Sequence, residues 1–284
     1  MFTYRMVRKI GEGGFGEVYA GYQNETGGKV AIKFLNHLTP DALERFRREA
    51  RILMRLSSSN VTRLIDFNFR GPRPFIVLEY CEYGSLQAWV TTRRSVRSIV
   101  AALTSVTVAM NEIHGQGGFH RDIKPSNILL QRDPQRGAVA KLGDFGLART
   151  GNTLASNVTH GPYGTAGYMA PEVSFGRPFD WMCDVYSLGI TGIELLTGGK
   201  NPLGLFNHKI PADLRSLLIS MVHVDPDRRP NGSNIEERMM RISHQLPPES
   251  PASDVVSDLF KAGLLVCGSV ALAHMIGDIV SRDS

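Results

Sequence analysis

The hydrophobic pattern of the chain changes near residue 80, and this change restricts the fold more than any other feature of the sequence. After that point the pattern is mostly helical, with apolar residues at three- and four-residue spacing in 96–114, 184–196 and 213–222. Before it, one helical stretch begins at Pro40, and the rest consists of short strand-like runs: 5–10, 16–21, 29–35, 63–69 and 75–80. We therefore expect an α+β protein in which a small twisted sheet with one helix precedes a larger, mostly helical part.

Composition and charge exclude several classes of protein. The 284 residues include 32 Lys and Arg against 27 Asp and Glu, and this excess of +5 is small and scattered, so we expect no nucleic-acid partner. The cysteines Cys81, Cys183 and Cys267 are odd in number and far apart. This pattern favours a reducing compartment over a disulfide framework or a zinc cluster. Residues 1–10 lack the apolar core of a signal peptide, so we expect a cytoplasmic location.

A glycine-rich segment lies between the first two predicted strands. Gly11, Gly13 and Gly16 carry no Cβ, so the backbone of a strand–turn–strand hairpin there can approach phosphate groups closely. The same spacing of glycines occurs in dinucleotide-binding folds, but in those folds a helix follows the glycines. Here a strand follows, which counts against a dinucleotide site.

Lys33 ends the apolar run Val30-Ala31-Ile32 and is the next candidate for binding an anion. A lysine at such a position is ordinarily a surface residue whose stem packs on apolar groups. Behind a glycine-rich turn, its ammonium can instead hold a phosphate, provided that a carboxylate orients it. The helix that begins near Pro40 offers Glu44 and Glu49, and we expect Glu49 because it directly precedes the apolar part of that helix.

The middle of the chain, 118–180, is rich in glycine, proline and polar residues, and a long irregular segment inside a compact domain is usually functional. It contains three motifs in order: His120-Arg-Asp122-Ile-Lys124-Pro-Ser-Asn127, Asp144-Phe-Gly146 and Ala170-Pro-Glu172. Taken singly, their aspartates and asparagine are typical of turns and caps. Together with the glycine-rich and lysine motifs, they resemble the eukaryotic-type protein serine/threonine kinase family. The resemblance runs from about Tyr4 to Asn234.

The resemblance implies a two-lobed protein kinase-like fold, with a small antiparallel β-sheet lobe that carries one main helix and a larger, mostly helical lobe. Together with the composition of the C-terminal part, the resemblance predicts four regions of the chain. These are an N-terminal lobe (1–80), a C-terminal lobe (81–245), a linker rich in proline and serine (246–258) and an apolar tail (259–284).

The implied activity is transfer of the ATP γ-phosphate to serine or threonine hydroxyls of protein substrates, with Mg²⁺, or alternatively Mn²⁺, as the metal. The implied catalytic residues are Lys33, Asp122, which receives the substrate hydroxyl proton, and Lys124, which contacts the γ-phosphate. Asn127 and Asp144 are the implied metal ligands, and both offer the hard oxygen atoms that Mg²⁺ prefers. The implied nucleotide-binding residues are Gly11, Glu12, Gly13, Gly14, Phe15, Gly16, Val18, Ala31, Lys33, Glu49, Glu79, Cys81 and Leu129.

Three further positions match residues of the family, and the last two, Asp184 and Arg229, match structural ones. Leu78 corresponds to the gatekeeper beside the adenine, Asp184 to a buried aspartate that anchors the catalytic loop, and Arg229 to the arginine that pairs with Glu172. In the family these last two residues shape the site without taking part in the chemistry.

Specificity and control are also implied by the resemblance. Lys124 and Thr165 match serine/threonine rather than tyrosine kinases. The segment from Asp144 to Glu172 has the full length of an activation segment. Its hydroxyls at Thr153, Ser156 and Thr159 are either autophosphorylation sites facing Arg121 and Arg149 or solvated loop residues. The connection from 196 to 213 is shorter than in the family, which leaves little room for its substrate-docking helix.

Two other functions compete with the kinase interpretation. The first is a relative that binds nucleotide or a partner without catalysis, and the intact Lys33, Asp122, Asn127 and Asp144 argue against it. The second is a small-molecule phosphotransferase of related fold, and the full activation segment argues against that.

The tail includes an apolar stretch, 262–280, whose nineteen residues are near the lower limit for crossing a bilayer as a helix. His274 and Asp278 interrupt it. Three interpretations stay open: a membrane anchor for a cytoplasmic enzyme, a helix packed on the larger lobe, or a self-association segment that uses Gly263, Gly268 and Ala271.

Overall fold

The computed structural model describes residues 3–13, 16–92, 94–134, 137–150 and 164–247. The chain divides into two units, Met1–Pro247 and Pro248–Ser284. The second unit, which contains the predicted tail, lies outside the described residues. The same holds for the hairpin tip at Gly14 and Phe15 and for the candidate phosphorylation sites Thr153, Ser156 and Thr159.

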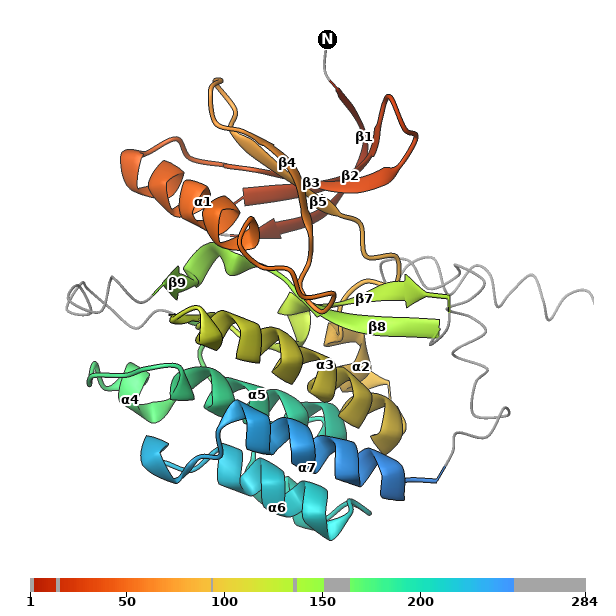
Figure 1. The fold of residues 1–284 in the computed structure, drawn as a ribbon, viewed down its shortest axis with the longest axis vertical. Helices are drawn as coiled ribbons and strands as arrows, with labels where there is room; N and C mark the ends of the chain where they lie inside the picture. Colours follow the sequence, from red (N-terminus) through yellow and green to blue (C-terminus); the bar gives the residue numbers. More distant parts are fainter. Residues whose placement is uncertain (1–2, 14–15, 93, 135–136, 151–163, 248–284) are drawn as a thin grey trace, which may run out of the picture. The chain divides into compact units, whose positions relative to one another are not determined.

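The N-terminal part is a five-stranded antiparallel sheet with one helix, as predicted (Figure 1). The strands pair in the order β1-β2-β3-β5-β4, and their bounds are β1 Tyr4–Gly13, β2 Gly16–Gln23, β3 Lys29–Phe34, β4 Leu64–Asn68 and β5 Phe75–Glu79. Helix α1, Pro40–Leu53, begins where the Thr39 hydroxyl accepts a hydrogen bond from the backbone N–H of Ala42. Its apolar side packs through Phe46 and Ala50 on the sheet residue Ile76, which fixes the direction in which the helix points its remaining side chains.

The opposite face of the sheet carries a cluster of aromatic rings. Phe34 of β3 lies 5.7 Å from Phe75 of β5 and 5.9 Å from Tyr19 of β2, measured between ring centroids. Tyr4 of β1 meets Phe75 edge-on at 6.4 Å. Because these rings come from four strands, they couple the glycine-rich hairpin of β1 and β2 to the strand that carries Lys33.

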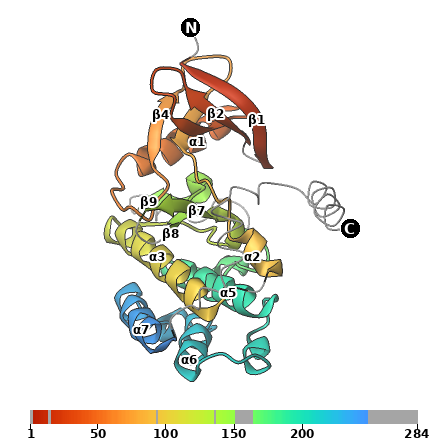
Figure 2. The same cartoon turned by 90° about the vertical axis from the view of Figure 1, so that its right-hand side faces the viewer.

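The helical part contains six α-helices within the described residues: α2 Gln87–Thr91, α3 Val96–Gly115, α4 Pro171–Ser174, α5 Met182–Thr197, α6 Ala212–Met221 and α7 Gly232–Gln245. Helix α3 lies beside both α5 and α7 (Figures 1 and 2). Helix α3 is long and apolar enough to cross a membrane by length and composition alone. Its apolar residues nevertheless form the centre of this core, as Leu103, Val106 and Met110 are fully buried.

Two small two-stranded sheets interrupt the segment that the sequence indicated as loop-rich. Strand β6 (Gly118–Phe119) pairs with β9 (Arg149–Thr150), and β7 (Ile128–Asp133) pairs with β8 (Gly137–Leu142). The β7–β8 hairpin begins directly after Asn127 and ends two residues before Asp144. It therefore brings the two predicted metal ligands to the same end of one rigid element.

The connection between α5 and α6 holds a single 3₁₀ turn, η4 (Pro202–Phe206), among the residues described there. This agrees with the short connection expected from the sequence. Leu205 is fully buried, whereas Leu203 is 69% exposed.

Replacing Leu103 with alanine should lower the free energy of unfolding by about 2–5 kcal/mol, because a fully buried leucine leaves a cavity. The matched control is Leu203→Ala on the exposed turn, which should change it by no more than about 0.5 kcal/mol. Urea unfolding followed by far-UV circular dichroism measures both. Equal effects of the two variants would show that the core does not depend on α3.

Candidate active site

The centre of the site is the ammonium group of Lys33, which joins three elements. Lys33 at the end of β3 donates hydrogen bonds to both carboxylate oxygens of Glu49 on α1, at 2.8 and 2.9 Å. It also donates to Asp144 Oδ1, at 2.9 Å. Lys33 is only 7% exposed and Glu49 1%. The structure thus brings the two residues paired in the sequence analysis into contact and adds Asp144 as a third member.

Charge pairing opposes the effect of burial on these groups. Burial alone would lower the pKa of Lys33, but the charges of Asp144 and Glu49 outweigh it and raise that pKa above its ordinary value. The charge of Lys33 in turn lowers the pKa of Asp144 from 3.8 to about 2. Burial raises the pKa of Glu49, and the neighbouring Lys33 offsets part of this effect. The Lys33–Asp144 contact is therefore an ion pair at neutral pH.

The predicted catalytic loop residues form a second connected group. The hydroxyl and the backbone N–H of Thr165 donate to Asp122 Oδ1, at 2.7 and 3.1 Å. Lys124 Nζ lies 2.8 Å from Asp122 Oδ2 and donates to the Thr165 hydroxyl at 2.5 Å. The ammonium of Lys124 therefore lies beside the carboxylate that is expected to take the proton.

A buried carboxylate holds the backbone of this loop. Asp184 on α5 is fully buried and accepts the backbone N–H groups of His120 and Arg121, each at 2.7 Å. Burial alone would raise the pKa of Asp184, but its hydrogen bond with His114, at 3.0 Å, helps to lower it. Arg121 has a φ of 74°, which costs energy for a residue with a side chain. The two backbone hydrogen bonds to Asp184 hold this strained turn in place.

His114 was not singled out from the sequence. It lies in the last turn of α3, and its ring also packs on Trp181 at 5.2 Å between centroids. Nothing in the local sequence indicates this role, because its partner Asp184 is 70 residues away.

Asn127 and Asp144 supply the oxygen atoms that a metal would need. Asn127 Nδ2 donates to the carbonyl of Asp122 at 2.8 Å and to its carboxylate at 2.9 Å, so the amide nitrogen is turned toward Asp122 and the amide oxygen away from it. The N–H of Gly143 donates to the carbonyl of Asn127 at 2.9 Å, which places Asp144 one residue from this contact. Asp144 has a left-handed backbone, with a φ of 58°.

This donor set fits Mg²⁺ or Mn²⁺ shared with a nucleotide. An amide and a carboxylate are hard oxygen ligands, and Mg²⁺ usually completes its shell with phosphate oxygens and water. No group of three or more His, Cys, Asp and Glu side chains suited to a metal occurs among the described residues. Asn127 and Asp144 would therefore hold the metal together with the nucleotide rather than as a closed protein cage.

The glycine-rich segment forms the predicted strand–turn–strand hairpin. Pairing of β1 with β2 continues as far as Gly13 opposite Gly16. A Cβ on Gly16 would lie 2.2 Å from the carbonyl oxygen of Phe34, whereas a Cβ on Gly13 would meet open space. Gly16 is therefore required by close contact with β3, and Gly13 is the position at which a ligand can approach the backbone.

The predicted adenine-binding residues lie where the sheet meets the helical part. Ala31 on β3 is in register with Leu78 on β5, Val18 on β2 is in register with Lys33, and Leu129 bridges to Ser85. Gly11 and Glu12 lie on β1, and Glu79 is the last residue of β5.

The side chains of Glu79 and Cys81 are not free to react. The Glu79 carboxylate accepts the N–H of Arg63 at 2.7 Å and pairs with Lys141 at 2.8 Å. Burial raises the pKa of the Cys81 thiol to about 12, so it stays protonated. Lys141 was not anticipated from the sequence, since it lies 62 residues from its partner.

The segment after Thr165, where a peptide substrate is expected, is fixed by two further groups of contacts. The Arg229 guanidinium pairs with both carboxylate oxygens of buried Glu172, at 2.6 and 2.8 Å, as the sequence predicted. Lys200, which the sequence analysis did not identify, lies with Nζ 4.0 Å above the ring of Tyr168 and 3.8 Å from Glu194. The Tyr168 hydroxyl also donates to Glu194.

The chain is similar to known proteins over most of its length. A family model described as the protein kinase domain matches residues 4–241. The chain is 38% identical over 200 residues to the serine/threonine-protein kinase Pkn1 of Myxococcus xanthus, covering 69% of the chain and 29% of Pkn1. It is 32% identical over 245 residues to the serine/threonine-protein kinase PknA of Mycobacterium tuberculosis, covering 80% of the chain and 54% of PknA. The chain thus spans less than two thirds of the length of these relatives.

Low pH should destabilise the folded protein in particular through protonation of Asp144. A carboxylate whose pKa is lowered by folding contributes stability above its ordinary pKa of 3.8, and this contribution is lost as the pH falls toward about 2. Between these values the unfolding free energy of the wild type should therefore fall more steeply than that of Asp144→Asn. Urea unfolding at a series of pH values measures the slopes. The exposed control Asp213→Asn should keep the wild-type slope, and parallel profiles for all three proteins would contradict the ion pair.

Proposed function

The chain belongs to the protein kinase domain family, and from this premise we propose that it transfers the γ-phosphoryl group of ATP to serine and threonine hydroxyls of proteins. The observation that carries the proposal is the double contact of Lys33 with Glu49 and Asp144, made while Asp122 faces Thr165 and Lys124. The side chains proposed for phosphoryl transfer thus form two hydrogen-bonded groups, one around Lys33 and one around Asp122. The reaction depends mainly on position and charge.

Each connected group has a role in the proposed reaction. The ammonium of Lys33 binds phosphate oxygens of ATP, and Glu49 and Asp144 fix its direction. Asp122 accepts a hydrogen bond from the substrate hydroxyl and takes its proton as the hydroxyl oxygen bonds to the γ-phosphorus. The bond from the γ-phosphorus to the ADP oxygen breaks. Lys124, beside Asp122, stabilises the negative charge on the transferred group.

The metal belongs to the same proposal. When Mg²⁺ or Mn²⁺ is bound, it neutralises charge on the phosphates of ATP, and Asn127 and Asp144 are the residues that would hold it. The turn of Asn127 toward Asp122, through the hydrogen bonds of its Nδ2, links the metal site to the proton-accepting carboxylate.

Contacts in the substrate segment favour serine and threonine as acceptors. Thr165 binds both Asp122 and Lys124, so the substrate segment is tied to the catalytic loop in the way that the resemblance to serine/threonine kinases implies. The relatives named above as serine/threonine kinases support the same specificity. The segment that ends at the Glu172–Arg229 pair favours a peptide over a small metabolite.

Two finer parts of the proposal concern control and location. We include autophosphorylation at Thr153, Ser156 or Thr159, because the segment that contains them follows Asp144 directly and Arg121 flanks Asp122. We also include a cytoplasmic location, with membrane attachment or self-association through the apolar stretch 262–280.

The test is transfer of labelled phosphate from γ-labelled ATP to the protein itself and to a serine- and threonine-containing peptide library, with Mg²⁺ present. Wild type and the surface control Asp213→Asn should both transfer label to serine or threonine. Asp122→Asn and Lys33→Met should lose about a hundredfold or more of the rate, since each removes a group that acts on the transition state. Mapping the labelled residues then tests Thr153, Ser156 and Thr159 individually.

The rival functions give different results in the same experiment. A protein that binds ATP but labels neither itself nor any peptide, in all preparations, is a nucleotide-binding module. Label on small metabolites and none on peptides identifies a metabolite phosphotransferase. Equal rates for wild type and Asp122→Asn would contradict the assigned role of Asp122.

A further inference from the structure

Two glutamates face each other at the neck of the glycine-rich hairpin. Glu12 on β1 and Glu17 on β2 are direct partners in the strand register, immediately before the pair Gly13 and Gly16. Like charges directly opposite on neighbouring strands destabilise the pairing. Here they also lie next to the backbone that is expected to receive the phosphates of ATP. The hairpin therefore needs compensating cations at this place.

Two cations meet this need, and they come from different parts of the sheet. Lys9 on β1 donates to Glu12 at 2.6 Å and to Glu17 at 2.7 Å. Arg73, in the turn between β4 and β5, donates to the other carboxylate oxygen of Glu17 at 2.6 Å. The four side chains Lys9, Glu12, Glu17 and Arg73 carry two positive and two negative charges, and we call them the hairpin clasp.

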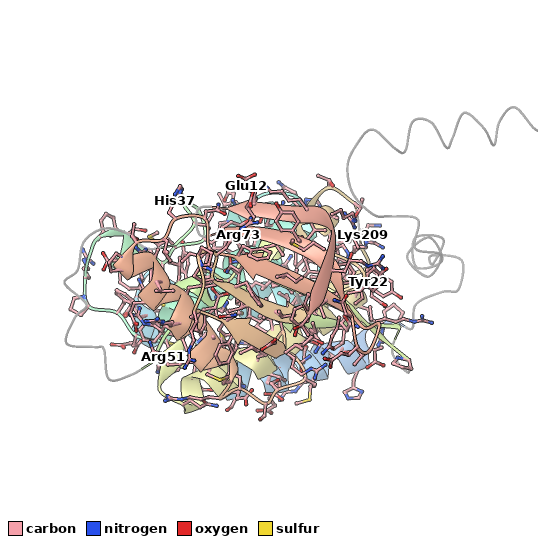
Figure 3. The ribbon with its side chains drawn as sticks, turned by 90° about the horizontal axis from the view of Figure 1, so that it is seen from above. Glu12, Tyr22, His37, Arg51, Arg73 and Lys209 are labelled. Atoms are coloured by element: carbon pink, nitrogen blue, oxygen red, sulfur yellow. The ribbon has the colours of Figure 1, made fainter. Side chains whose placement is uncertain are left out.

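Arg73 is held in place independently of its ion pair. It lies between Pro72 and Pro74, whose rings restrict the backbone of the turn. Its guanidinium carbon lies 4.3 Å from the centroid of the Phe34 ring. Phe34 directly follows Lys33 on β3, so the hairpin clasp connects the hairpin to the strand that carries the central lysine. Figure 3 shows Arg73 and Glu12 near each other on the outer face of the sheet.

We propose that Lys9 and Arg73 position the glycine-rich hairpin for nucleotide by neutralising Glu12 and Glu17. The inference rests on the proposed function, in which ATP phosphates bind under this hairpin. Lys9 and Arg73 are positioning residues, because they act through the two glutamates and touch no reacting atom. Removing either cation leaves one net negative charge at the neck of the hairpin, where it repels both the opposite strand and the incoming phosphates.

The hairpin clasp differs from an isolated ion pair on the surface, which contributes little to stability. Single pairs on a surface are worth little because two mobile side chains must be ordered for one contact. In the hairpin clasp Lys9 serves both glutamates, Glu17 serves both cations, and the Phe34 ring already orders Arg73. Hydrogen bonding to Glu12 and Glu17 raises the pKa of Lys9, and hydrogen bonding to Lys9 lowers that of Glu17. These two shifts favour the charged forms of Lys9 and Glu17 at neutral pH.

The experiment compares Arg73→Gln, Arg73→Lys and Arg70→Gln in the full chain. Arg70 lies in the same turn and is exposed, and no ion pair of its side chain is found among the described residues, so Arg70→Gln is the matched control. Arg73→Gln should raise the Kd of Mg·ATP about three- to tenfold and leave kcat within about twofold, because only positioning is lost. Arg73→Lys retains the charge and should recover most of the affinity.

The second measurement is amide hydrogen exchange of β1 and β2 without nucleotide. It tests whether the hairpin clasp stabilises these strands even if no phosphoryl transfer is found. Exchange there should be faster in Arg73→Gln than in wild type and unchanged in Arg70→Gln and Arg73→Lys. The proposal is overturned if Arg73→Gln changes neither exchange nor Kd, or if Arg70→Gln changes them equally. It is also overturned if Arg73→Lys is as impaired as Arg73→Gln. A wild-type protein that binds no ATP would contradict the proposed function, while the exchange data would still decide on the hairpin clasp.

Discussion

The rest of the site depends on one buried ammonium group. An amine that is 7% exposed stays charged only beside carboxylates, and Lys33 has two of them, Glu49 and Asp144. Because these carboxylates come from helix α1 and from the turn after β8, the ion pairs can form only when the sheet, the helix and that turn are together. The same contacts that keep the lysine charged therefore assemble the site.

A second buried charge, that of Asp184, orders the loop that carries Asp122. Asp184 is fully buried and binds two successive backbone N–H groups, at His120 and Arg121. The left-handed backbone of Arg121 is costly by itself and is stable only with such support. Asp144, the other non-glycine residue with a positive φ among those described, is held through Lys33. The two strained residues thus lie where buried charges meet the site.

The sequence was informative where a contact is local or belongs to an ordered motif. Lys33 and Glu49 are only sixteen residues apart, on a strand and the helix that follows it, and the Glu172–Arg229 pair follows from the family resemblance. It did not indicate pairs in which one partner is distant and belongs to no motif, as for His114 with Asp184 or Lys141 with Glu79. Strands β6 and β9 have two residues each, too few to show a periodic pattern. Such contacts exist only once the fold has formed.

The most direct test of this account is the rate of phosphoryl transfer by Glu49→Gln at saturating Mg·ATP. Glutamine keeps the size of the side chain and removes the charge that orients Lys33, so the account predicts a fall in kcat of about tenfold or more. Glu44→Gln is the control, since Glu44 is an exposed residue of the same helix that pairs with Arg51. It should transfer phosphate at the wild-type rate. A wild-type rate in Glu49→Gln would contradict the claim that the buried ion pairs of Lys33 assemble the site.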